Sequence, residues 1–129
     1  MSQEKILVIE DNSDNLELVR FILSQAGYTV LTASDGLTGL NLARQELPDM
    51  LLLDLTIPEL DGWQVATEIK NDPATANMCV VALTAHTLPG DRKRALDSGC
   101  DGYISKPLDL PNFVSEVAAL LEKTHARRN

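Results

Sequence analysis

The sequence predicts an α/β fold built on a doubly wound, five-stranded parallel sheet with helices on both faces. Short apolar runs alternate with segments of helical spacing along the chain, which is typical of repeated strand–helix units. Most of these runs also end in a polar residue, as strands do when their carboxyl ends line a ligand crevice. One common order for such sheets, 2-1-3-4-5, places the crevice where the first and third strands separate.

The first strand and the first helix are predicted from residues 5–27. The run Lys5–Ile9 is apolar after its first residue and is expected to be a strand. The helix that follows is predicted by apolar residues on one face, namely Leu16, Val19, Leu23 and Ala26. Gly27 is expected to end this helix, and Ser13 or Asp14 to cap its start.

The next segments repeat the pattern. Tyr28–Ala33 is expected as the second strand, and a helix stopping before Pro48 follows it. Met50–Leu53 is apolar without alternation, as expected for a third strand covered on both faces. Helical spacing of apolar residues predicts the second helix at Leu40, Ala43 and Leu47, and the third at Val65, Ala66 and Ile69.

The last part of the chain supplies two strands and two helices. Cys79–Leu83 and Gly102–Ser105 are the expected fourth and fifth strands. Between them a helix with a thin apolar face is expected to begin near Pro89 or Asp91 and to stop near Gly99. The final helix, with Asp109 as its expected cap, is predicted by Phe113, Val117, Leu120 and Leu121.

Length and composition favour one acidic cytoplasmic domain. We expect residues 1–129 to form a single domain of 14.1 kDa, with a core of about residues 5–121 and a short basic tail at 123–129. The net charge of −8 argues against nucleic-acid or anionic-membrane binding. The sequence contains no leader-like segment and no apolar run of about 20 residues, as a membrane span would need. Cys79 and Cys100 lack metal-ligand spacing and are expected to be reduced thiols.

Three carboxylates mark the ends of the first and third strands. Glu10 and Asp11 follow the first apolar run, and Asp54 follows the third. Because parallel strands end at one edge of the sheet, these acids are expected to share a pocket, where their charges would repel without a cation. Mg²⁺ prefers oxygen ligands and often binds one or two carboxylates plus a substrate phosphate. We therefore predict a Mg²⁺ site here, which Mn²⁺ could also fill.

The other strand ends carry groups that suit phosphoryl chemistry. Asp54 is the candidate nucleophile, because a carboxylate can attack phosphorus and form an aspartyl phosphate. Thr84 and Lys106 are expected to bind phosphoryl oxygens through a hydroxyl and a positive charge. Tyr103 has two readings: it packs in the core, or it alternates between exposed and buried rotamers when Thr84 moves.

Four motifs together resemble a known family. They are Glu10-Asp11-Asn12, the stretch from Asp54 through Pro58 to Gly62, Ala82-Leu83-Thr84-Ala85, and the stretch from Gly99 through Tyr103 to Lys106-Pro107. In this order and at this spacing they resemble a response-regulator receiver domain over residues 5–121. The resemblance implies a flavodoxin-like (βα)5 fold and a place in a two-component or phosphorelay signalling system. It also implies a phosphoacceptor rather than an enzyme, with at most slow autophosphorylation and autodephosphorylation.

The resemblance assigns roles to individual residues. Asp54 would accept a phosphoryl group from a phosphohistidine on a histidine kinase or a histidine phosphotransfer protein. The backbone carbonyl of Thr56 would join the three carboxylates as a Mg²⁺ ligand, and Tyr103 would be a switch residue coupled to Thr84. Thr56 and His86, each two residues beyond a site residue, would tune the rate of dephosphorylation. Glu10 departs from the family, where Asp is more frequent, but it keeps the carboxylate.

The resemblance also bears on output and assembly. No output domain is expected after residue 121, so the chain would be a stand-alone receiver or part of a larger regulator or hybrid kinase. Phosphorylation would then switch a protein-interaction surface on the fourth helix, the fifth strand and the last helix. Receivers that dimerise ahead of DNA-binding domains carry a basic residue in the last helix, whereas this chain has Glu116. A monomer or a weak dimer is therefore expected.

Three alternatives remain open. A phosphatase or phosphotransferase of the haloacid dehalogenase type would carry a second Asp two residues after the nucleophile, where this chain has Thr56. A flavodoxin-like cofactor binder would need a Ser/Thr/Gly-rich phosphate loop, but an acidic loop, residues 10–14, follows the first strand. A degenerate receiver acting only as a scaffold would lack site residues, which are all present here.

Overall fold

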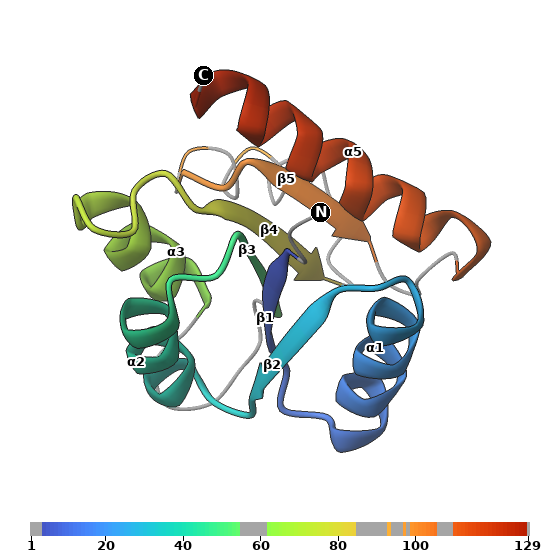
Figure 1. Ribbon diagram of the computed structural model, residues 1–129. Helices are drawn as coiled ribbons and strands as arrows, with labels where there is room; N and C mark the ends of the chain where they lie inside the picture. The colour runs from blue at the N-terminus through green and yellow to red at the C-terminus, as the bar shows by residue number, and fades with distance from the viewer. Residues whose placement is uncertain are drawn as a thin grey trace.

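The computed structural model describes residues 4–54, 62–84, 93, 97, 99–105 and 110–128 (Figure 1). It has five strands in one parallel sheet of order β2-β1-β3-β4-β5, which confirms the predicted fold class and strand order. The strands are β1 (Lys5–Ile9), β2 (Thr29–Ala33), β3 (Met50–Asp54), β4 (Cys79–Thr84) and β5 (Gly102–Ser105).

Helices cover both faces of the sheet. In Figure 1, α1 and α5 lie over one face, and α2 and α3 lie over the other. Most of the expected fourth helix falls outside the described residues. Lys93 and Asp97 are described, and both are in helical conformation. The helices are α1 (Ser13–Gln25), α2 (Gly36–Glu46), α3 (Gly62–Asn71) and α5 (Leu110–Arg128). None of the described helices is long and apolar enough to cross a membrane.

The alternation of side chains along each strand divides the core into two clusters. Leu7 and Ile9 of β1 point to the α2/α3 face, whereas Ile6 and Val8 point to the α1/α5 face. Every residue of β3 is buried, as expected for a central strand covered on both sides. Each Å² of apolar surface removed from water stabilises a fold by about 25 cal/mol. The buried aliphatic strands therefore contribute the main part of the stability.

Several predicted helix boundaries need correction. The cap of α1 is Asn12, whose side-chain oxygen accepts a hydrogen bond from the Asn15 backbone amide, and is neither Ser13 nor Asp14. Ala26 is the exposed C-cap rather than a residue of the buried face. Leu47 is also an exposed C-cap, with a positive φ of 47°, and not part of the apolar face of α2.

The carboxyl-terminal residues differ from the expected short tail. The last helix continues to Arg128, so the basic residues after Glu122 extend α5 instead of leaving it. Asp109, the expected cap of this helix, lies outside the described residues. Phe113, Val117 and Leu121 form the buried face of α5 as predicted.

A lysine joins three elements at the amino-terminal edge of the sheet. Lys70, near the end of α3, makes an ion pair with Asp101, with Nζ 2.8 Å from Oδ2. The same Nζ donates to the backbone oxygens of Ala76 and Met78 at 3.2 and 2.6 Å. The Val80 amide also donates to Asp101 Oδ2, at 2.9 Å. Lys70 therefore links α3 to the segments that lead into β4 and β5.

Candidate functional site

The sheet brings three acidic side chains together at its carboxyl-terminal edge. In the register of β1 and β3, Ile9 lies beside Leu53, so Glu10 and Asp54 follow at the same level. One carboxylate oxygen from each of Glu10, Asp11 and Asp54 lies within 4.8 Å of the other two. Sequence reasoning predicted this cluster, and the parallel register is its physical cause.

The cluster is only partly open to solvent. The side chains of Glu10 and Asp54 are buried, with residues 2% and 3% exposed, while Asp11 is exposed. A buried carboxylate needs a hydrogen bond, an ion pair or a bound cation to offset its lost hydration. The site therefore combines two sheltered acids with one that faces solvent.

Glu10 is held through both its backbone and its side chain. Its amide donates to the carbonyl oxygen of Ala33, at 3.0 Å, which continues the pairing of β1 with β2 by one residue. The Asn15 side-chain Nδ2 donates to Glu10 Oε1, also at 3.0 Å. Asn15 itself is fixed in the first turn of α1 by the Asn12 cap, at 2.9 Å. The loop from β1 into α1 is thus bonded at both of its ends.

Three carboxylate oxygens in this arrangement fit a hard divalent cation. Oxygens that share one Mg²⁺ at about 2.1 Å lie at most about 4.2 Å apart, so the 4.8 Å limit of this cluster is close to that geometry. The donors are all oxygens, as Mg²⁺ prefers, and a site of three acids leaves coordination positions for water or a substrate phosphate. Mn²⁺ also takes oxygen ligands of this kind.

Two of the remaining predicted site residues, Thr84 and Tyr103, lie within the described part of the chain. Thr84 ends β4 and pairs with Ser105 of β5, one residue beyond the pairing of Asp54 with Leu83, so its backbone reaches the same edge as the acids. Tyr103 is half-buried in β5 and packs against the core on the α2/α3 face. Lys106, Thr56 and His86 lie outside the described residues.

Two asparagines that organise this site have roles that were not predicted from the sequence. Asn12 caps α1, and Asn15 donates to Glu10. An Asn directly before a predicted helix is itself a capping signal, and side chains in the first helical turn lean back toward the preceding residues. The capping role of Asn12 could therefore have been predicted from the sequence.

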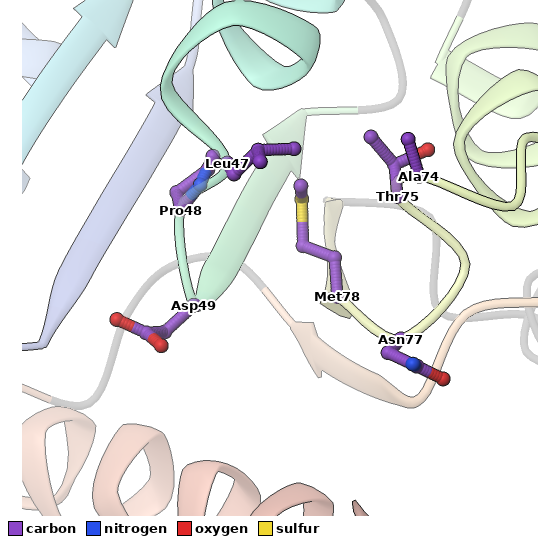
Figure 2. Close-up of a pocket in the computed structure, with 7 residues that line it drawn as sticks. All are labelled: Leu47, Pro48, Asp49, Ala74, Thr75, Asn77 and Met78. Carbon is purple, nitrogen blue, oxygen red and sulfur yellow. The ribbon is translucent and has the colours of Figure 1, made fainter.

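A pocket lies at the opposite edge of the sheet from the acid cluster. Figure 2 shows a pocket between the connection from α2 to β3 and the connection from α3 to β4. It is lined by Leu47, Pro48, Asp49, Ala74, Thr75, Asn77 and Met78. These residues precede β3 and β4, so the pocket lies at the amino ends of the strands, away from the acid cluster. It contains none of the predicted site residues.

Comparison with known proteins agrees with this geometry. The family profile of the response regulator receiver domain matches residues 6–118. The polar-differentiation response regulator DivK of Brucella anthropi is 35% identical over 118 residues, which cover 92% of this chain and 96% of DivK.

Solved structures show the same fold. The receiver domain of sensor histidine kinase PA1611 from Pseudomonas aeruginosa, solved with a magnesium ion coordinated in the active-site cleft, is 30% identical, with a TM-score of 0.82. The alignment covers 95% of this chain and 97% of that one. The chemotaxis response regulator CheY4 of Vibrio cholerae, 23% identical, matches in fold with a TM-score of 0.88 over 92% of this chain and 99% of its own. The chain therefore belongs to the response-regulator receiver domain family of two-component signalling proteins.

Proposed function

We propose that this receiver accepts a phosphoryl group on Asp54 in a Mg²⁺-dependent reaction. The observation that carries the proposal is the cluster of Glu10, Asp11 and Asp54, with one oxygen of each within 4.8 Å of the others. A relative of 30% identity holds magnesium in its active-site cleft, which supports the same ion here. Glu10, Asp11, Asp54 and the backbone carbonyl of Thr56 are the proposed ligands.

Asp54 is the proposed nucleophile because it ends the buried strand β3 at the edge of the sheet where the three acids meet. One of its carboxylate oxygens attacks the phosphorus of a phosphohistidine, so that a P–O bond forms as the P–N bond breaks. The electron pair of the broken bond returns to the imidazole nitrogen of the donor. The cation supplies charge neutralisation as the phosphoryl group approaches the carboxylates. Burial of Asp54 shields the resulting acyl phosphate from water on its strand side.

The surrounding residues complete the proposed site. Thr84 would donate its hydroxyl to one phosphoryl oxygen, and Lys106 would place its positive charge near another. Tyr103 would respond to the position of Thr84 and so pass the change to the surface formed by the fourth helix, β5 and α5. Thr56 and His86 would tune the lifetime of the phosphoryl group.

The proposed donors are a histidine kinase or a histidine phosphotransfer protein in the cytoplasm. The proposed role is that of a signalling phosphoacceptor and not of an enzyme that turns over a separate substrate. Neither nucleic acid nor a membrane is a proposed partner, because the chain carries a net charge of −8. A monomer or a weak dimer is the proposed assembly state.

Intact-protein mass spectrometry tests the proposal. The protein is incubated with acetyl phosphate with and without Mg²⁺, beside Asp54→Asn. We expect one added phosphoryl group on the parent protein only when Mg²⁺ is present, and none on Asp54→Asn. Glu116→Gln serves as a matched control, since this exposed acid lies on α5 and should leave phosphorylation unchanged. Equal phosphorylation of Asp54→Asn and the parent would contradict the proposal.

A further inference from the structure

We propose that Asn15 is a positioning residue that holds the carboxylate of Glu10 in the geometry for Mg²⁺ binding. This inference rests on the proposed function, because it concerns the same cation. It starts from a single contact, the 3.0 Å hydrogen bond from Asn15 Nδ2 to Glu10 Oε1, which joins the first turn of α1 to the end of β1.

The local fold aims Asn15 at this carboxylate. The Asn12 side chain accepts a hydrogen bond from the Asn15 backbone amide at 2.9 Å, and this fixes the position of Asn15 at the start of α1. Helical side chains lean toward the amino terminus of their helix. The Asn15 amide therefore reaches back toward Glu10, five residues earlier in the chain.

Glu10 needs such a restraint more than a shorter acid would. A glutamate has one more rotatable side-chain bond than an aspartate, so its carboxylate can reach more positions from the same backbone. Asn15 fixes one oxygen of that carboxylate by a hydrogen bond. Residues that orient metal ligands in this way commonly contribute 10- to 100-fold to metal affinity.

The chemistry of the amide also suits a cation site. A Lys or Arg at this position would bring a positive charge beside the acids and compete with Mg²⁺. An Asp or Glu would add a fourth carboxylate and could not donate to the ionised Glu10. The amide of Asn15 donates a hydrogen bond without adding charge, so it orients the ligand and leaves the electrostatics of the cluster to the three acids.

A double-mutant cycle on Mg²⁺ affinity tests the inference, with amide chemical shifts in a magnesium titration as the readout. We expect Asn15→Ala to lower the affinity about tenfold, at the lower end of the range for ligand-orienting residues because Asn15 is exposed. In the Glu10→Asp background the shortened side chain draws back by about 1.5 Å, one carbon–carbon bond. The hydrogen bond from Asn15 is then lost, and Asn15→Ala should change the affinity less than about twofold.

Asn41→Ala is the matched control, because Asn41 is an exposed asparagine on α2, away from the acids. It should leave Mg²⁺ affinity unchanged. Unchanged affinity in Asn15→Ala would overturn the inference while the proposed function stands. An equal loss in both backgrounds would also overturn it, since the effect would then act through the helix and not through Glu10. A parent protein that binds no Mg²⁺ would overturn the inference and the metal-dependent proposal together.

Discussion

Replacing Lys70 by Met should destabilise the fold strongly, although Lys70 lies far from the acid cluster. The Lys70–Asp101 ion pair has a distance of 2.8 Å, and its side chains are only 19% and 10% exposed. Met keeps the aliphatic stem but removes the charge and the hydrogen bonds to the Ala76 and Met78 carbonyls. Asp101 then remains mostly buried, without its lysine partner.

The magnitude follows from this burial. Removing one partner of a buried ion pair typically costs about 3–5 kcal/mol. Because Lys70 keeps some contact with solvent, we expect a loss near the lower limit, about 3 kcal/mol. For a chain of this length, one kcal/mol corresponds to about 4 °C in Tm, so the midpoint should fall by about 12 °C.

Urea denaturation followed by circular dichroism measures this loss. The matched control is Lys93→Met, because Lys93 pairs with Asp97 at a similar distance, 3.0 Å, but with side chains 78% and 65% exposed. An exposed pair at i,i+4 in a helix contributes only about 0.3–0.5 kcal/mol, so this variant should stay within about 0.5 kcal/mol of the parent. A Lys70→Met variant no less stable than Lys93→Met would refute the reasoning from burial.

Three other expectations follow from local contacts. Gly39→Ala should lower the free energy of unfolding by about 1–3 kcal/mol in a denaturant titration, because the new Cβ would overlap the side chain of Ile9. Unchanged stability would contradict that close packing. Asp35→Ala removes the α2 cap, whose side chain accepts a hydrogen bond from the Thr38 backbone amide at 2.7 Å. The free energy of unfolding should fall by about 1 kcal/mol in the same titration, and no change would refute the capping role. Burial raises the pKa of the Cys100 thiol from 9.0 to about 12, so the unfolded state releases its proton first and stability should fall as the pH rises above 9. Relative to Cys100→Ala, the parent should lose about 1 kcal/mol between pH 9 and about 10, and parallel curves for the two proteins would contradict this.

The strand ends illustrate what a sequence can predict. Parallel strands end at one edge, so Glu10 and Asp54 could be placed together from the apolar runs that precede them. The register that pairs Ile9 with Leu53 then sets Glu10 and Asp54 at the same level of the sheet. Local pattern and sheet geometry were sufficient here because Glu10 directly follows β1 and Asp54 is the last residue of the buried strand β3.

Helix ends were harder to predict, because they depend on side-chain contacts that periodicity does not show. Leu47 fits the apolar spacing of α2, yet the helix has already ended there in a left-handed turn. Asn12 caps α1 in place of its neighbours because its backbone is extended and its oxygen reaches the Asn15 amide. The contact between Asn15 and Glu10 depends on the angle between α1 and the end of β1. The spacing of residues in the sequence does not predict that angle.

The roles of Thr84, Lys106, Tyr103, Thr56 and His86 stay predictions. For Thr84, the structure shows only that its backbone reaches the right edge of the sheet. Phosphoryl lifetime measured in His86→Ala and Thr56→Ala, with the parent alongside, would assign rate tuning to these positions.

The most direct test of the central claim is to locate the phosphoryl group on the chain. After treatment with acetyl phosphate and Mg²⁺, an acyl phosphate is reduced by borohydride, which converts the modified aspartate to homoserine and marks its position for peptide mass spectrometry. We expect the label at Asp54, the acid that ends the buried strand β3. A label at Glu10 or Asp11, or on a residue outside this cluster, would contradict the account.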